Sequence, residues 1–440
     1  MPFLGLQNIK TISRDETDTQ LRFVVESTLN TYCPHCQSDH LQKWTAKKDQ
    51  HFMDIPTHGK KTAIWLDRKR WKCVNCGKTF LERLDWADET RKMTKRLVKY
   101  IQTASLKETF TSLSDAIGVD PKTIKNVFEE YVQALQNTYR FETPEILGID
   151  EIHLMKRPRG VITNIREKTI VDILKDRNKP TIIEYLKTLD RQTVRLVTMD
   201  MWRPYRDAVS EVLPDAQIII DKFHVVRMAN DAIERVRKAN RGKLKPNQRR
   251  DLMHDRFILL KRQHELSDAE AFTLSHWINN YDDIAAAYRL KESFYGIYEA
   301  RDATEAYNRY EAWESGLTEE IRPYFEDLRK AVSNWHQEIF SYFNHRHTNA
   351  YTESINNIIR HIDRDGRGYS FEVLRAKVIY THGMIKQKTF RSGNGYSREA
   401  FAVGKATHGD MMRMATATKE KTLYYGADIA HMEKVKDFGQ

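Results

Sequence analysis

The sequence predicts a multidomain α/β protein, and three observations support this fold class. Two cysteine pairs lie in a short N-terminal region that favours β-strands. A helical block with an internal glycine turn follows it. Strand-like and helix-like runs then alternate, a pattern typical of a layered sheet, before a long and almost wholly helical region. At about 100–200 residues per domain, this length implies two to four domains.

The composition is that of a globular protein that prefers anionic partners. The 440 residues include 72 Lys and Arg against 61 Asp and Glu, a net charge of +11, and 40% are hydrophobic. No run of 18 apolar residues occurs, so we expect no membrane span. The N-terminus lacks the layout of a secretory signal, so we expect a cytoplasmic protein.

The positive charge is concentrated in three segments. Residues 60–99 hold 13 basic and 5 acidic residues, residues 222–262 hold 13 and 4, and residues 360–391 hold 8 and 3. A solvated helix face explains any one segment equally well. Three separate segments favour a nucleic acid as the partner.

The two cysteine pairs have the spacing of a structural zinc site. The expected ligands are Cys33, Cys36, Cys73 and Cys76. Two residues between thiols let both sulfurs face one Zn²⁺ ion, and Gly77 follows the second pair where the turn needs a positive φ. A redox dithiol or free buried cysteines are the alternatives, but a redox motif needs only one pair in a βαβ context. Basic residues of this ribbon make contact with DNA phosphate plausible, among them Arg68, Lys69 and Arg70.

The helical block predicts a helix–turn–helix. One helix is expected at 93–106, a short one at 112–117, and a third that begins at Pro121 with Asp120 as its N-cap. Four polar side chains project outward from the start of the third helix, as groove reading requires, namely Lys122, Thr123, Lys125 and Asn126. A plain helical hairpin with a glycine corner is the alternative.

The alternating region has the strand order of an RNase H-like sheet. Strands are expected at 146–154, 160–167, 168–175, 194–200 and 217–221, with helices after the third, fourth and fifth. The first apolar run ends at Asp150, and the fourth strand ends at Asp200. In such a sheet these strands are neighbours, so both carboxylates can share two Mg²⁺ or Mn²⁺ ions. Strand-end caps are the alternative reading of these two residues.

The expected third carboxylate is Glu353, in a helix whose isoleucines form an apolar stripe. Glu353, Asn356 and Arg360 share the polar face, so Glu353 can reach the metals while the other two approach phosphate. A solvated glutamate that stabilises the helix dipole is the alternative.

Taken together, these motifs resemble bacterial insertion-sequence transposases of the ISL-three family, which are DDE enzymes. The resemblance covers nearly the whole chain and includes CPHC, CVNCGKTF, GIDEIHL, VTMDMWRPYRDAVSEVLPDAQIIIDKFHVV and NAYTESINNIIRHIDRDGRGYSFEVLRAKV. It implies a catalytic triad of Asp150, Asp200 and Glu353. It also implies a helical insertion near 240–340, whose Trp277, Trp313 and Trp335 are expected in the core.

A D-x-x-H element, Asp221 to His224, resembles one that follows the second Asp in related transposases. The resemblance implies that His224 orients a phosphate or a catalytic carboxylate. Asp221 is the main rival of Asp200. Asp363 and Asp365, expected in a glycine-rich turn, are the rivals of Glu353, whereas strand alternation directs Glu151 away from Asp150.

The expected function is a DNA transposase that binds terminal inverted repeats and catalyses strand cleavage and transfer. Its expected partners are transposon ends, target DNA and further copies of itself in a homodimer or larger assembly, and its expected place is at the nucleoid. A regulator with a degenerate nuclease core and a structure-specific nuclease are the alternatives. The expected regions are a zinc ribbon (1–85), a helix–turn–helix domain (92–138), the first part of the core (145–239), the insertion (240–340), the last part of the core (341–390) and a tail (391–440).

Overall fold

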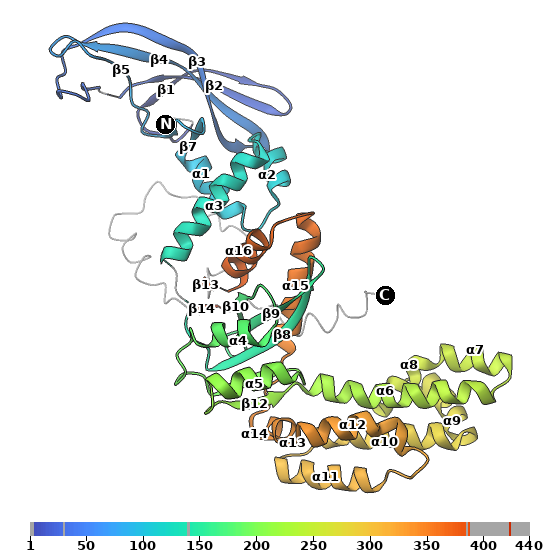
Figure 1. Cartoon of the computed structure of the whole chain (residues 1–440). Coiled ribbons are helices and arrows are strands. Elements are labelled where there is room, and N and C mark those ends of the chain that lie inside the picture. The colour runs from blue at the N-terminus through green and yellow to red at the C-terminus, as the bar shows by residue number, and fades with distance from the viewer. Residues whose placement is uncertain (1–3, 30, 139–140, 384–385, 388–421, 424–440) are drawn as a thin grey trace, which may run out of the picture. The chain divides into compact units, whose positions relative to one another are not determined.

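The structure is a computed structural model that describes residues 4–29, 31–138, 141–383, 386–387 and 422–423 (Figure 1). The expected tail at 391–440 therefore lies outside the described residues, apart from 422–423. The chain forms two compact units, one from residues 1–140 and 363–381 and the other from 141–362 and 382–440. No described helix is long and apolar enough to cross a membrane.

The first unit is built on a seven-stranded sheet. Six strands follow the order β1-β2-β4-β3-β7-β6, and β5 pairs with β4. Their bounds are β1 (Ile9–Glu16), β2 (Gln20–Ser27), β3 (Leu41–Thr57), β4 (Lys60–Cys73), β5 (Thr79–Leu81), β6 (Ala87–Asp88) and β7 (Met93–Thr94). A two-residue turn at His58 and Gly59, with φ of +52° and +74°, closes the long β3–β4 hairpin between the cysteine pairs.

Three helices follow as the helix–turn–helix expectation requires. They are α1 (Lys95–Ala104), α2 (Phe110–Ile117) and α3 (Pro121–Thr138). Gly118 ends α2 with a φ of +76°. The Asp120 carboxylate accepts the backbone N–H of Thr123 at 2.9 Å, which caps α3. Ile124, Val127 and Phe128 are buried and Tyr131 is half-buried, so the apolar face of α3 is directed inward.

A buried carboxylate joins these helices to the sheet. Asp54 of β3 is fully buried and accepts hydrogen bonds from Thr94 Oγ1 at 2.7 Å and Arg96 Nε at 2.8 Å. Thr94 is also the N-cap of α1. The ribbon and the helix–turn–helix, expected as separate regions, therefore form part of one compact unit.

A helix from the far end of the chain completes this unit. α16 (Phe371–His382) carries Lys377, which is 2% exposed. Its ammonium donates to the carbonyls of Ser105 and Glu108 and lies 4.8 Å from the ring centre of Phe110. Burial lowers the pKa of Lys377 to about 8. The sequence had placed 341–390 in the core, but apolar burial of α16 against the helix–turn–helix outweighs its nearness in sequence to Glu353.

The second unit contains the RNase H-like sheet, in the order β10-β9-β8-β11-β12. β8, β11 and β12 are parallel, whereas β9 and β10 are antiparallel to their neighbours. The bounds are β8 (Ile146–Leu154), β9 (Arg157–Asn164), β10 (Thr169–Ile173), β11 (Leu196–Met199) and β12 (Gln217–Ile220). All five strands occur within three residues of their predicted bounds, β9 being the most shifted, and β8 and β11 are neighbours as expected.

Helices pack on this sheet and extend into the insertion. The first three are α4 (Lys179–Leu186), α5 (Arg203–Val212) and α6 (Lys222–Asn240). The insertion adds α7 (Pro246–His254), α8 (Arg256–Leu260), α9 (Asp268–Asn280), α10 (Asp282–Ile297), α11 (Ala303–Ser315), α12 (Arg322–Asn334), α13 (His336–Phe340) and α14 (Tyr342–His345). One hydrophobic core runs from the sheet through α6 into the insertion. It contains Trp277, Trp313 and Trp335, each at most 5% exposed, as expected.

The chain then returns to the sheet through α15 (Ala350–Gly366), which carries Glu353. The division between the two units falls within this helix, after Ile362. Two short strands, β13 (Lys386–Gln387) and β14 (Thr422–Leu423), pair further along the chain.

Candidate functional site

Register brings the first two acidic residues together. β8 and β11 run parallel, and Gly148 lies opposite Thr198. Asp150, within β8, and Asp200, directly after β11, each follow two residues later, so they lie at the same level of neighbouring strands. Because successive side chains alternate between the two faces of a sheet, an offset of two residues keeps both on one face.

Asp150 is buried among other carboxylates. Its side chain accepts the amide N–H of Asn356 at 2.7 Å, and the residue is 6% exposed. Burial first, and then the charge of Asp200 and that of Glu353, raise the pKa of Asp150 to about 8. The three acidic residues of the expected triad therefore act on one another electrostatically. The sequence predicts that Asn356 approaches phosphate, whereas in the structure its amide donates to Asp150.

The start of α15 is fixed to the sheet by hydrogen bonds. Asn349 is 1% exposed, and its amide donates to the carbonyl of Ile149 at 3.2 Å. Its carbonyl oxygen accepts from Thr198 at 3.2 Å and from Thr352 at 2.6 Å. A Cβ atom on Gly148 would lie 2.7 Å from Thr352 Oγ1, so only glycine lets α15 approach β8 this closely. Sequence reasoning missed Asn349 because its role depends on two strands distant in the chain.

His224 joins two further carboxylates at the start of α6. Its Nδ1 lies 3.0 Å from Asp200 Oδ1 and 3.6 Å from Asp221 Oδ2. Contact with Asp200, and then with Asp221, raises the pKa of His224 to about 10, so the imidazole is cationic at neutral pH. Asp221 is fully buried, whereas the Asp200 side chain is 25% exposed. Asp200 is therefore the more accessible of the two rivals.

This cluster has the donor chemistry of a divalent cation site. Apart from their ion-pair contacts with His224 Nδ1, Asp200 Oδ1 and Asp221 Oδ2 are buried without a hydrogen-bond partner, so both keep lone pairs for another ligand. Ligand atoms of Asp200, Asp221 and His224 lie within 4.8 Å of one another, although His224 can ligate a cation only in its neutral form. Several carboxylates crowded together are costly without a cation, and carboxylate oxygens are the ligands that Mg²⁺ prefers. The residues present fit this group.

A small cavity opens beside Asp200 and His224. It has a volume of about 350 Å³, and Trp202 and Arg227 also line it. Arg227 lies one turn after His224 on α6, and its guanidinium is exposed. A cation at this position can approach a phosphate held at the carboxylates. Sequence reasoning missed Arg227, although the i, i+3 spacing from His224 was a usable signal.

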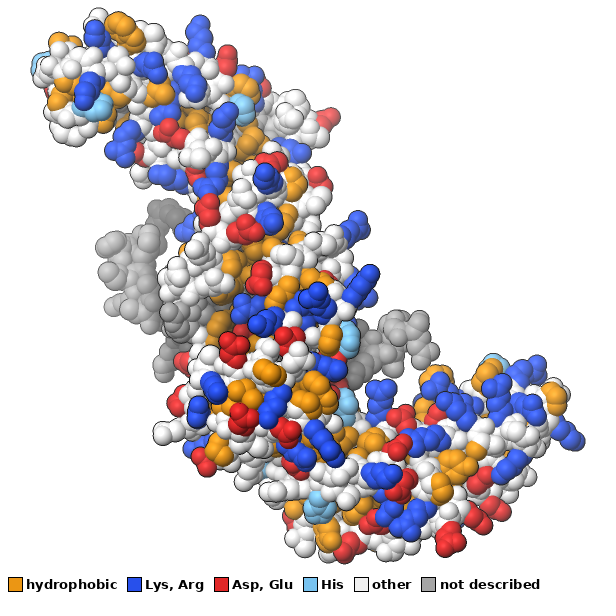
Figure 2. All heavy atoms as spheres, in the orientation of Figure 1, with side chains coloured by type: hydrophobic (Ala, Val, Ile, Leu, Met, Phe, Trp, Pro, Cys, Tyr) orange, Lys and Arg blue, Asp and Glu red, His pale blue; other side chains and the backbone are white. Residues whose placement is uncertain are grey.

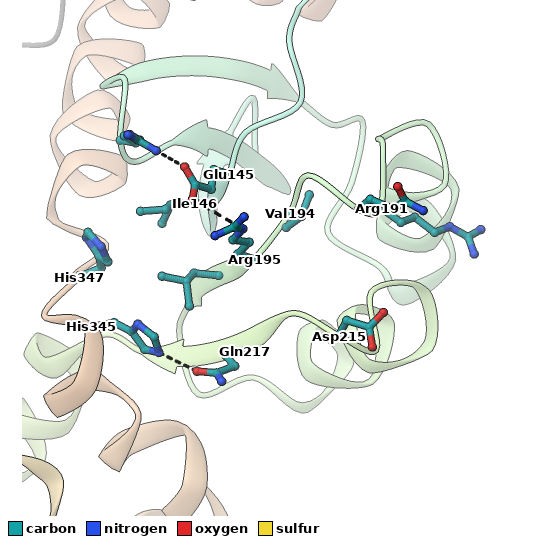
Figure 3. Close-up of a pocket in the computed structure, with 12 residues that line it drawn as sticks. Glu145, Ile146, Arg191, Val194, Arg195, Asp215, Gln217, His345 and His347 are labelled. Carbon is teal, nitrogen blue, oxygen red and sulfur yellow. Dashed lines mark hydrogen bonds and ion pairs between the residues drawn. The ribbon is translucent and has the colours of Figure 1, made fainter.

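A larger cavity, of about 920 Å³, lies at the opposite, amino-terminal edge of the parallel strands (Figure 3). Its carboxylate Glu145 pairs with Arg166 and lies 3.8 Å from Arg195. His345 contacts Gln217 Oε1 at 2.6 Å. These polar groups bind one another, which leaves fewer of them for a ligand. The larger cavity is therefore not preferred over the one beside Asp200 on size alone.

The remaining expectations around the triad have mixed outcomes. Glu151 forms ion pairs with His153 and Arg177, away from Asp150 as expected. Arg360 is exposed and donates to Asn357 Oδ1 at 2.9 Å. Asp363 and Asp365 belong to the last turns of α15, and not to a glycine-rich turn as expected, because the helix continues to Gly366.

The four cysteines converge at the end of the long hairpin. Cys33 Sγ lies 3.6 Å from Cys76 Sγ, and Cys36 Sγ lies 3.5 Å from Cys73 Sγ. All four sulfurs lie within 4.8 Å of one another. Tetrahedral Zn²⁺ with bonds of about 2.3 Å separates its sulfurs by about 3.8 Å, so the cluster fits one zinc ion. A backbone N–H of Cys76 lowers the pKa of Cys73 to about 6, which favours the thiolate.

The expected DNA-contact residues differ in availability. On α3, Lys122, Lys125 and Asn126 are exposed and Thr123 is half-buried, so this face is open to solvent. The expected contact of Arg68 with DNA phosphate is wrong. The residue is 6% exposed, and its guanidinium donates to the carbonyl of Glu82 and the carboxylate of Glu89. It stabilises the fold and is not available to phosphate. Lys69 pairs with Glu26 at 2.9 Å, and Arg70 is exposed.

Comparison with known proteins identifies the family. Residues 147–378 match the ISL3 DDE family model, described as a transposase. The chain belongs to the ISL3 family of transposases. Residues 82–132 match the helix–turn–helix domain of transposase family ISL3, and residues 30–76 match the zinc finger of transposase IS204/IS1001/IS1096/IS1165. The transposase for insertion sequence element IS1001 of Bordetella parapertussis is 22% identical over 324 residues, which cover 72% of this chain and 80% of that protein.

Removal of one cysteine is expected to abolish zinc binding by this transposase. Cys73→Ser leaves three thiolates and an open coordination position, which weakens a structural zinc site. Metal analysis of the purified protein should give about one Zn²⁺ per chain for the wild type and much less for the variant. His40→Ala is the matched control, because this exposed histidine lies beside the knuckles and is expected to leave the zinc content unchanged. Equal zinc content in Cys73→Ser would contradict the four-thiolate site.

Neutralisation of Asp150 is expected to stabilise the metal-free protein. Since its pKa in the folded protein exceeds the usual value, the folded state binds more protons between about pH 4 and pH 8, and the free energy of unfolding falls as pH rises across that window. In EDTA at pH 8.5, Asp150→Asn should therefore melt at least about 2–4 °C above the wild type. Mg²⁺ or Mn²⁺ should raise the melting temperature of the wild type alone.

Asp207→Asn is the control for this measurement, because it removes an exposed carboxylate of α5. It should melt like the wild type at every pH. A lower melting temperature for Asp150→Asn in EDTA would show that the carboxylate is satisfied without a metal ion.

Proposed function

We propose that this transposase binds the terminal inverted repeats of its insertion sequence and uses Asp150, Asp200 and Glu353 to cut and join DNA strands. The observation that carries the proposal is the raised pKa of Asp150, which arises from burial and from the charges of the other two residues. Such crowding of carboxylates from two neighbouring strands and a helix favours two-metal phosphodiester chemistry.

The proposed reaction consists of two in-line displacements. Water attacks the phosphodiester at each end and frees a 3′-hydroxyl, and this hydroxyl then attacks a phosphodiester of target DNA. Two Mg²⁺ or Mn²⁺ ions held by the three carboxylates would activate the attacking oxygen and stabilise the charge on the leaving oxygen. No covalent link between protein and DNA is needed.

The residues around the triad have positioning roles in this proposal. Asn356 holds Asp150 by an amide hydrogen bond of 2.7 Å. His224, cationic beside Asp200, orients that carboxylate, and Asp221 supports His224 from the buried side. The accessibility of Asp200 supports its assignment to the triad in preference to Asp221.

DNA binding is assigned to the first unit. The exposed residues at the start of α3 are suited to a groove, and Arg70 to phosphate. The zinc ion would fix the end of the hairpin, and it would thereby hold the ribbon surface that faces DNA in one conformation. Because two ends are processed together, we propose a homodimer or a larger assembly on DNA.

Mobilisation of a marked mini-element with its flanking repeats tests the proposal. The wild type should yield joined products, whereas Asp150→Ala, Asp200→Ala and Glu353→Ala should each reduce joining by at least about 10³-fold, because each removes a metal ligand. Binding to the ends should persist in all three variants. Asp207→Ala, which removes an exposed acidic residue of α5, should join strands like the wild type.

The same assay separates the alternatives. End binding by the wild type without cleavage, with Mg²⁺ or Mn²⁺ supplied, would favour a DNA-binding regulator. Cleavage without joining would favour a structure-specific nuclease. Loss of end binding in the triad variants equal to the loss of joining would contradict the proposed separation of binding and chemistry.

A further inference from the structure

The helical insertion carries a concentrated basic surface that the proposed chemistry does not use. The ten residues from Arg241 to Arg250 contain five Lys and Arg and no acidic residue. All five are exposed, and together they are called the basic tip, which consists of Arg241, Lys243, Lys245, Arg249 and Arg250. Lys and Arg side chains gather at this end of the insertion in Figure 2, over α7 and α8 of Figure 1.

Most of this charge is not neutralised by the protein. Lys243 lies 3.2 Å from Asp283, and Arg249 donates to the carbonyl of Leu244. Among the described residues, none of Arg241, Lys245 and Arg250 has a carboxylate within 4.0 Å. Three cations without partners close together repel one another, so they gain from an external anion.

Apolar side chains adjoin the basic tip. Met253 is 52% exposed on α7, one turn beyond Arg249 and Arg250, and Phe257 is 53% exposed on α8. The guanidinium of Arg256 lies 5.6 Å from the ring centre of Phe257. Exposed apolar groups flanked by cations suit nucleic acid, since sugars and bases lie beside its phosphates.

The charge of the insertion is strongly segregated. Residues 237–262 contain ten basic and two acidic residues, whereas residues 299–327, which include α11, contain three basic and nine acidic residues. Five of the ten basic residues pair with Glu234, Glu270, Glu292 or Glu299, so the charge that is not neutralised lies mainly in the basic tip; the five are Arg237, Lys238, Arg256, Lys261 and Arg262. Solubility does not require basic and acidic residues to be separated in this way, because a surface on which they are mixed is equally soluble. The segregation points to an anionic partner at one end of the insertion.

We propose that the basic tip is a second DNA-binding surface, which holds the phosphate backbone of a duplex without reading its sequence. This inference rests on the proposed function only in taking DNA as the partner. The duplex is either the DNA that flanks an element end or the target, and both present the same phosphate chemistry. The helix–turn–helix then supplies sequence recognition, and the basic tip supplies affinity.

The test uses the full chain and measures DNA binding in EDTA, where no strand is cut. The variant Arg241→Ala/Lys245→Ala/Arg250→Ala removes the three unpaired cations. The control Arg301→Ala/Arg322→Ala/Lys330→Ala removes the same charge from exposed positions in or beside the acidic stretch 299–327. The probes are an unrelated duplex, an element end without flanking DNA, and an element end with flanking DNA, each titrated over a range of salt concentrations.

The basic-tip variant should bind the unrelated duplex at least about tenfold more weakly at low salt, and its salt slope should fall by about 2 to 3, because each phosphate contact contributes about 0.9. The control should bind like the wild type. A conservative Arg241→Lys/Arg250→Lys variant should retain binding, since a phosphate contact needs only the charge. All variants should melt like the wild type, because the altered side chains are exposed.

The probes separate the two DNA sources. A loss that grows when flanking DNA is added to the end assigns the surface to the flank, whereas a loss confined to the unrelated duplex assigns it to the target. Unchanged affinity and salt slope in the basic-tip variant, or an equal loss in the control, would overturn the inference. If the wild type never cuts ends but the basic-tip variant still loses affinity, the proposed chemistry fails and this inference stands.

Discussion

Electrostatic repulsion among carboxylates crowded around the buried Asp150 is the constraint around which the second unit is organised. Parallel pairing of β8 and β11 sets Asp150 beside Asp200, and α15 adds Glu353. Packing of the apolar core does not favour bringing these carboxylates together, because removing a carboxylate from water costs free energy. The hydrogen bonds of Asn349 and the absence of a side chain at Gly148 hold α15 against the sheet despite that cost. Under the proposed function, a bound cation would offset this repulsion.

Much of this arrangement could be predicted from the sequence. Short apolar runs that end in aspartate defined the strands, and their order placed Asp150 next to Asp200. The zinc ligands followed from spacing alone. Side-chain partners could not be predicted in this way. Asn356 binds Asp150 and Arg68 is buried against Glu82 and Glu89, because contacts between residues far apart in the chain leave no periodic signal.

Domain boundaries were the weakest part of the sequence prediction, for a physical reason. α16 follows α15 directly, so nearness in the chain assigned it to the core. Its buried Lys377 instead binds two carbonyls of the helix–turn–helix and packs against Phe110. A segment beyond Glu353 thus completes the unit to which DNA binding is assigned, while the insertion carries its own charged surface. The segments to which we assign recognition and chemistry consequently alternate along the chain.

The most direct test of this account is anomalous scattering from a crystal of the transposase bound to an element end and grown with Mn²⁺. The account predicts two peaks about 4 Å apart, with Asp150 between them and with Asp200 and Glu353 among their ligands. An absence of Mn²⁺ from these carboxylates, or a single ion held by Asp221 with Glu353 out of reach, would contradict it.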